Sequence, residues 1–413
     1  MKHGLSRRAL LLGSAAVAGA AAVTRFPFVR EARADAPSDT AVVLVYLSGG
    51  YNAIFPCPQA FKAAGSFSVS DGNVTDVGGG RLVDKTLFGS ITPARWSHMA
   101  QVGVRHGLSN HDAAQNALWT TTKRESRPLL LANALGGDAA IKCAALGRKP
   151  PGFHGAQGNA SMQVITSLGT VLAAYGKSVD PLAPSRSRAA AGLAAASKMS
   201  ATKLGAAPVT GADMTSGYSS VVDLLQKPTP GLDSFSLSDV ATGYGLPTNV
   251  DAVNDIRSQL VGAELMIRTG TRVVTVVDGG SPAWDTHGDS TAELARNQMG
   301  DRTAANPAGR YITSALRRFL DRMSDPTVVG STKVVTVLFG DFSRSLPGSD
   351  HAANLTATAF GDRVKAGSTG DVDAAVRLVD GTPGIDGFWS YIAAMAGGSV
   401  ASWGANPHSA ITL

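Results

Sequence analysis

The sequence of 413 residues has few cysteines and, after its first segment, no apolar run long enough to cross a bilayer. Cys57 and Cys143 are its two thiols, so their number excludes a zinc site built from cysteines alone. In an oxidising compartment the two would form one disulfide or remain as buried free thiols. Both alternatives stay open because a sequence does not supply the distance between them.

The mature chain also lacks an excess of positive charge. The whole sequence has 37 Lys and Arg against 31 Asp and Glu. Residues 1–34 hold six of the basic residues and one acid, which leaves 31 basic and 30 acidic residues beyond them. No basic stripe interleaved with aromatic residues is present. The net charge of +6 therefore gives no argument for a nucleic-acid partner.

Residues 1–34 have the order of a twin-arginine signal peptide. Arg7 and Arg8 precede an apolar core at 9–23, and Ala32-Arg33-Ala34 is a small-x-small cleavage site. We expect the mature chain to begin at Asp35. The twin-arginine export machinery would carry it, already folded, to the periplasm or the outside of a bacterial cell. A generic cleaved signal peptide or a basic tail is the alternative.

The order of apolar segments predicts an α/β fold. Short β-branched runs predict buried strands at 41–47, 101–105, 272–277 and 334–339, and helical spacing predicts helices at 251–267, 308–323 and 388–395. Alternation of strand, loop and helix is typical of a large, mostly parallel sheet with helices on both faces. We expect one such domain over 35–413. Within it, 187–250 is an insertion: an Ala-rich surface helix or connector at 187–207, then an irregular segment at 208–250.

Polar side chains collect where the predicted strands end. Histidine is scarce, with eight in the chain, yet four histidines lie just after predicted strands or in the loops that follow. These loops carry His106, His111, Asp285, His287, Asp341, Asp350 and His351. In open α/β sheets ligands bind beyond the carboxyl ends of the strands, and Asp and His are natural ligands of a divalent cation. The sequence therefore predicts a metal site there. The structural alternative is a set of turn and helix caps.

Two further residues are candidates for catalysis. Ser109 precedes a predicted helix that runs through Gln115 to Trp119, and Ser109 or Asn110 would cap it. A hydroxyl at the positive end of a helix is also suited to attack a phosphate or sulfate ester. Arg344 would clamp an anionic group, or simply pair with Asp341.

The residues at 44–56, 106–119, 284–289 and 337–351 resemble a known family. LVYLSGGYNAIFP, HGLSNHDAAQNALW, WDTHGD and VLFGDFSRSLPGSDH follow the pattern of the bacterial exported proteins grouped as domain of unknown function 1501. That family is related to the alkaline phosphatase and sulfatase superfamily. The resemblance covers nearly the whole mature chain, and its specific parts are WDTHG and the Asp341 to His351 unit.

The resemblance implies an alkaline phosphatase/sulfatase-like fold that binds one or two cations, commonly zinc, calcium, magnesium or manganese. It implies Asp285, His287, Asp341, Asp350 and His351 as metal ligands, and it places Ser109 or His111 at the nucleophile loop. Two departures stand out. Asn52 occupies the place of a metal-binding Asp after the Gly-Gly turn, and Ala352 follows Asp350-His351 where the family often continues with Gly and a second His.

Two hypotheses for the function follow. The first is an exported metal-dependent hydrolase of a phosphate or sulfate ester, with Ser109, His111 and Arg344 acting on a small anionic substrate. The second is a non-catalytic exported binding or assembly protein with a degenerate metal site, for which Asn52 and the missing second His are the arguments. The sequence names neither the substrate nor the metal.

Overall fold

The structure is a computed structural model of the chain. It describes residues 39–50, 71–78, 81–137, 139–152, 162–175, 186–203, 218, 221–222, 232, 234–279, 284–373, 375, 377–380 and 382–413. Within these ranges, no helix is long and apolar enough to cross a membrane.

The strands are β1 (Thr40–Leu47), β2 (Val74–Asp76), β3 (Leu82–Asp84), β4 (Met99–Arg105), β5 (Cys143–Leu146), β6 (Met162–Ile165), β7 (Val273–Asp278), β8 (Lys333–Gly340), β9 (Arg344–Ser345), β10 (Asp350–His351), β11 (Asn354–Phe360), β12 (Gly367–Thr369), β13 (Asp371–Val372), β14 (Leu378–Asp380) and β15 (Thr382–Pro383). The helices are α3 (Lys85–Phe88), α4 (Pro93–Trp96), α5 (His111–Trp119), α6 (Arg127–Leu135), α7 (Leu168–Ala174), α8 (Arg186–Lys203), α10 (Leu237–Gly243), α11 (Ile256–Arg268), α12 (Glu293–Met299), α13 (Ile312–Met323), α14 (Pro326–Val329) and α15 (Gly384–Met395), with short 3-10 turns at Asp71–Asn73 and Ser409–Ile411.

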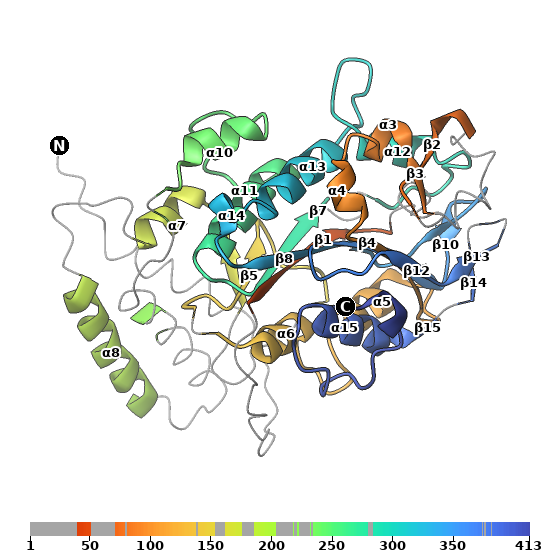
Figure 1. Ribbon diagram of the computed structural model, residues 1–413. Coiled ribbons are helices and arrows are strands. Elements are labelled where there is room, and N and C mark those ends of the chain that lie inside the picture. The colour runs from red at the N-terminus through yellow and green to blue at the C-terminus, as the bar shows by residue number, and fades with distance from the viewer. Residues whose placement is uncertain are drawn as a thin grey trace.

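A nine-stranded sheet forms the centre of the molecule (Figure 1). Its order is β12-β4-β11-β8-β1-β7-β5-β6, with β15 also paired to β4. Every pairing in this sheet is parallel except those of β11, which runs antiparallel to both β4 and β8. The prediction of a large, mostly parallel sheet is confirmed. The strand β11 is not among the strands that the sequence predicts.

The strand β1 lies in the middle of the sheet and separates two hydrophobic cores. Ala41, Val43 and Val45 belong to the core under α11 and α13, whereas Val42 and Leu44 belong to the core under α6 and α15. Successive side chains of a strand point to opposite faces, so an unbroken apolar run is buried on both sides. Figure 1 shows α11 and α13 on one side of the sheet and α6 and α15 on the other.

The predicted helices are present; α11 and α13 begin later than their apolar patterns suggested, and α15 begins earlier, at Gly384. Helix α11 starts at Ile256, because Asp255 caps it in a capping box with Ser258. Helix α13 starts at Ile312, after Tyr311 adopts a left-handed backbone conformation with φ 61°. The buried face of α13, which includes Leu316 and Phe319, contributes about 2–3 kcal/mol of transfer free energy for each large side chain.

The structure describes part of the segment 187–250. The Ala-rich segment forms α8, whose side chains are mostly exposed, as a surface helix requires. The irregular segment at 208–250 contains a helix that was not expected, α10, which Ser236 caps by accepting a hydrogen bond from Asp239 N. Much of the remainder of this segment lies outside the described residues.

Of the two cysteines, the structure describes Cys143. It lies in β5 as a buried free thiol, and burial raises its pKa well above the usual range. Cys57 lies outside the described residues.

Candidate metal centre

Five segments meet at one edge of the sheet because of the strand register. Leu47, at the end of β1, is opposite Asp278 of β7 and Gly340 of β8, so the residues that follow all three strands emerge together. The strand β11 enters from this same edge, because its first residue, Asn354, is opposite Arg105 at the end of β4. The segments after β1, β4 and β8, the turn that begins at Trp284, and the turn before β11 therefore share one edge.

His111 is the first residue of α5, which Asn110 caps by accepting a hydrogen bond from Ala113 N. Its Nδ1 lies 2.7 Å from Oδ2 of Asp341, the residue after β8. Gln115, one helical turn on, donates to the same oxygen at 2.9 Å. The hydrogen bond to Asp341 raises the pKa of His111 despite partial burial. Asp341 therefore fixes the orientation of the imidazole.

Asp341 is fully enclosed. Its Oδ1 accepts the backbone N–H of Gly49 at 3.0 Å, and its side chain has no exposed surface. Both oxygens are thus engaged by groups of the chain. The sequence resemblance implies Asp341 as a metal ligand, but the structure places it behind His111, where carboxylates that orient ligand histidines are usually found.

Asp285 lies at the start of a turn held against the end of β1. The N–H of the preceding residue, Trp284, donates to Ser48 O at 3.0 Å, and a Cβ on Gly49 would lie 2.7 Å from Asp285 N. Burial alone would raise the pKa of Asp285, but the hydrogen bond and charge of Arg344 outweigh it, and the pKa is lowered. The carboxyl group is therefore ionised at neutral pH.

His351 presents its Nε2 to the same carboxylate. Its Nδ1 lies 2.9 Å from Ser109 O, so Nδ1 carries the proton and donates it to this carbonyl. Its ring stacks on Phe342, with centroids 4.5 Å apart and planes 11° apart. Its Nε2 is 3.5 Å from Oδ1 of Asp285. Both ends of the ring and one face are thus fixed.

Three ligand atoms converge, one each from His111, Asp285 and His351, all within 4.8 Å of one another. His111 Nε2 is buried 3.4 Å from Asp285 Oδ2, and it has no hydrogen-bond partner among the described residues. Because Asp341 accepts the Nδ1 proton, Nε2 of His111 carries a lone pair. A buried lone pair without a donor is costly unless a proton or a cation satisfies it.

His287 lies beside these three residues. Its Nε2 is 3.1 Å from His351 Nε2 and 3.1 Å from Asp285 Oδ1. Ligand atoms around a tetrahedral zinc ion are about 3.3 Å apart, given zinc–nitrogen bonds of about 2.0–2.1 Å. We call His111, Asp285, His287 and His351 the edge cluster. Imidazoles and one carboxylate suit zinc or a similar borderline cation, so the residues fit the group that the sequence predicts.

Arg344 is buried, and its guanidinium pairs with Asp285 rather than with Asp341. It also donates to the carbonyls of Gly49, Gly50 and Ser349. These contacts hold three loops around the edge cluster. A guanidinium occupied in this way is not available to clamp a substrate anion. The structure therefore favours neither of the two roles predicted for Arg344, the anion clamp or the pair with Asp341.

The remaining predicted residues lie at the margin of the edge cluster or outside the described part. Asp350 is largely exposed, with its Oδ1 3.9 Å from His287 Nδ1. Ser109 is exposed, and its carbonyl holds His351. The cap of α5 is Asn110, not Ser109. Asn52 lies outside the described residues.

Two residues of this site were not predicted from the sequence. Gln115 was noted only as a helical residue, although its position four residues after His111 places both on one helix face. Phe342 directly follows Asp341 and contacts His106, His111 and His351 with its ring. A single aromatic residue after a strand gives no signal of this kind. His106 itself packs beside Phe342, and burial lowers its pKa to about 4.

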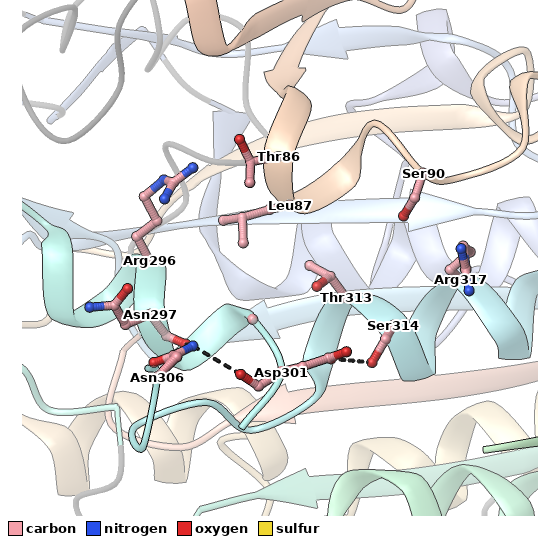
Figure 2. Close-up of a pocket in the computed structure, with 11 residues that line it drawn as sticks. Thr86, Leu87, Ser90, Arg296, Asn297, Asp301, Asn306, Thr313, Ser314 and Arg317 are labelled. Atoms are coloured by element: carbon pink, nitrogen blue, oxygen red, sulfur yellow. Dashed lines mark hydrogen bonds between the residues drawn. The ribbon is translucent and has the colours of Figure 1, made fainter. Parts of the chain in front are cut away.

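A pocket of about 380 Å³ lies elsewhere, between α3, α12 and α13 (Figure 2). Asp301 bonds both Ser314 and Asn306 there, and Arg296 pairs with Asp84. None of its lining residues belongs to the edge cluster.

Comparison with known proteins adds little. No protein-family model matches the sequence. No curated protein matches it either. Among solved structures, a match is a protein in the alkaline phosphatase superfamily from Vibrio parahaemolyticus, with 8% sequence identity and a TM-score of 0.36, over 95% of this chain and 76% of that chain.

Proposed function

We propose that the chain is an exported metal-dependent hydrolase of a phosphate or sulfate ester. One observation carries the proposal: the Nε2 atoms of His111 and His351 both face Asp285, because the Nδ1 atoms are held by Asp341 and by Ser109 O. This arrangement of carboxylate or carbonyl, histidine and open nitrogen is the one found around catalytic zinc. The sequence resemblance to exported relatives of alkaline phosphatases supports the same reaction class.

The edge cluster would hold the cation, with His111, Asp285 and His351 as ligands and His287 as the fourth. When bound, a divalent cation supplies Lewis acidity toward a phosphoryl or sulfuryl oxygen. The chain's own residues set the geometry. Asp341 holds the Nδ1 proton of His111, and the stack on Phe342 fixes the ring of His351.

Ser109 is the candidate nucleophile in this proposal. It lies in the loop before α5, is exposed, and is tied through its carbonyl to His351. A hydroxyl in this loop would be the group of the chain that attacks an ester held at the edge cluster. In the proposed function Arg344 positions Asp285 and the two glycine carbonyls, and it does not contact the substrate.

Export by the twin-arginine route forms part of the proposal. The route carries folded proteins, so the edge cluster would be assembled and loaded before the chain leaves the cell. Fusion of residues 1–40 to a reporter that is active only when exported folded tests this step. Replacing Arg7 and Arg8 with Lys should abolish export, while the same change at Arg25 and Arg30 should leave it intact.

One contact favours the non-catalytic alternative. The guanidinium of Arg344 already neutralises Asp285, which leaves the edge cluster with less need of a cation. A binding or assembly protein would need the same loop geometry but no metal and no turnover. The following experiment separates the two functions.

The test is metal content and ester hydrolysis of the purified chain. We expect about one bound zinc or manganese ion per chain, and turnover of 4-nitrophenyl phosphate, bis-(4-nitrophenyl) phosphate or 4-nitrophenyl sulfate. His111→Ala and Asp285→Asn should lose both properties. His98→Ala, at the opposite end of β4 from the edge cluster, should keep both.

The two failures are informative in different ways. A chain that binds metal through the edge cluster but leaves all three esters intact supports the non-catalytic alternative. The hydrolase proposal is rejected if the chain purifies without metal, hydrolyses none of the esters, and shows no change of Tm with zinc, manganese, calcium or magnesium.

A further inference from the structure

A second polar cavity opens at the same edge of the sheet, on the side of β5 and β7. Its volume is about 600 Å³, which is within the range of small-molecule sites. Its walls are the ends of β5 and β7, the residues before and at the start of α11, and the loop between α12 and α13. We call it the arginine pocket, because Arg148, Arg257, Arg302 and Arg310 line it against two carboxylates, Asp255 and Asp278.

Two of the four guanidinium groups are compensated. Arg257 pairs with Asp255 at 2.9 Å and lies over the ring of Tyr311, 3.9 Å from its centroid. Arg310 pairs with Asp278 at 3.3 Å. Asp278 also accepts the indole N–H of Trp284 at 2.8 Å. Both carboxylates of the pocket are therefore already engaged by arginines.

The other two guanidinium groups form no ion pair with a carboxylate of the described residues. Arg302 donates its Nε to Gly309 O at 3.2 Å and has no acidic partner in the described part of the chain. Arg148 is half-buried and has neither a hydrogen bond nor an ion pair with any described residue. Burial lowers the pKa of Arg148; the nearby charge of Asp278 acts against this shift, and that of Arg310 acts with it. Arg148 and Arg310 thus share one nearby carboxylate, Asp278, which leaves an excess of positive charge that an anion would neutralise.

The pocket is built rather than incidental. Gly147 has φ 76°, and a Cβ there would lie 2.5 Å from Val253 O and 3.3 Å from Gln259 Nε2. Gln259 in turn donates to Val277 O at 3.0 Å, which fixes this wall to β7. The N-terminus of α11 does not provide the anion site, because the side chain of Asp255 occupies its N–H groups.

We infer that the arginine pocket binds an oxyanion group, a phosphate, sulfate or carboxylate of a small organic anion, through Arg148 and Arg302. It is separate from the edge cluster, since the two share no residue. Trp284 connects them: its indole bonds Asp278 of the pocket, and the next residue is Asp285. If the chain is a hydrolase, the arginine pocket would hold a second anionic group of the ester. This role in catalysis rests on the proposed function, whereas anion binding itself does not.

The test is isothermal titration of the full chain with inorganic phosphate, sulfate and citrate in the presence of a chelator, so that no cation is loaded at the edge cluster. We expect binding of at least one anion. Affinity should fall about tenfold in Arg148→Gln and in Arg302→Gln, as one charge-assisted contact predicts. Arg148→Lys should recover part of the loss. Arg317→Gln, an exposed arginine of the pocket in Figure 2, is the matched control and should bind as the parent does.

Failure of this inference is distinct from failure of the hydrolase. His111→Ala and Asp285→Asn should leave anion binding unchanged, because neither residue lines the arginine pocket. Two results would overturn the proposal that the arginine pocket binds an anion. The first is equal anion affinity of the parent and Arg148→Gln. The second is loss of anion binding in His111→Ala but not in Arg148→Gln. If the chain binds an anion through Arg148 but hydrolyses no ester, the proposal of an anion site stands. Only its role in catalysis is then rejected.

Discussion

The Nδ1 atom of His111 lies 2.7 Å from Oδ2 of Asp341, although the two residues are 230 positions apart in the chain. One begins a helix and the other follows the strand β8, so their contact depends on the whole sheet being assembled. The contact directs the other ring nitrogen, Nε2, toward Asp285. The candidate metal centre thus depends on a residue that would not itself touch the cation.

Asp341→Asn tests this relationship. The amide keeps one acceptor but presents an NH₂ group where Gln115 and His111 now donate. We expect zinc affinity to fall about 10–100-fold, the usual effect of removing a carboxylate behind a ligand histidine. The measurement is zinc titration at pH 7. Asp325→Asn, which removes a carboxylate that caps the remote helix α14, should leave the affinity unchanged. Equal zinc affinity in the parent and Asp341→Asn would refute this role.

Arg344→Gln distinguishes a structural arginine from a substrate clamp. The buried guanidinium bonds Asp285 and three loop carbonyls, so its removal leaves a partly buried carboxylate unpaired. We expect a loss of about 3–5 kcal/mol in the free energy of unfolding, measured by urea denaturation. Arg363→Gln removes an exposed pair with Asp39 and should cost at most about 1 kcal/mol. If Arg344→Gln loses ester turnover without a loss of stability, Arg344 acts as a clamp on the substrate anion instead.

The sheet was predictable from the sequence because its central strands are continuous apolar runs. Each of the four predicted strands is present to within two residues at either end, and each is buried. The strand β11 was not predicted, since Asn354, Thr356 and Thr358 interrupt its apolar pattern. Two of these polar side chains form hydrogen bonds: Thr356 with Ser343 at 3.0 Å, and Asn354, whose Oδ1 accepts from Leu378 N at 3.4 Å.

The candidate site was predictable in position but not in detail. Strand ends and the scarcity of histidine located Asp285, His287 and His351, and the structure brings them together. The roles of Asp341 and Arg344 depend on which acceptor each side chain reaches across the loops. No local pattern encodes that choice, because alternatives such as an Arg344–Asp341 pair satisfy the same charges.

Gly49→Ala probes the close approach of β1 to the turn at Asp285. Gly49 has φ 109°, and a Cβ would lie 2.7 Å from Asp285 N, so the substitution adds a collision to backbone strain. We expect a loss of about 2–4 kcal/mol in the free energy of unfolding and weaker zinc binding. Gly330→Ala is the matched control: φ is 62° and nothing lies within 4 Å, so it should cost only about 1–2 kcal/mol. Similar losses of unfolding free energy in the two variants would show that the turn at Asp285 moves to accommodate a side chain at position 49.

His408 predicts an acid-dependent loss of stability that does not involve the candidate site. Burial lowers its pKa to about 4, whereas an unfolded histidine titrates near 6.5. As the pH falls below 6.5 the unfolded chain binds the proton first, so stability decreases until the folded pKa is reached. Between pH 7 and pH 5 this group accounts for about 2 kcal/mol. His408→Gln removes the titration and retains a partner for Thr369 Oγ1, which lies 2.7 Å from His408 Nδ1. Its unfolding free energy should therefore fall less steeply with acid than that of the parent or of His98→Gln. Parallel pH profiles of the parent and His408→Gln in urea denaturation would contradict the assignment.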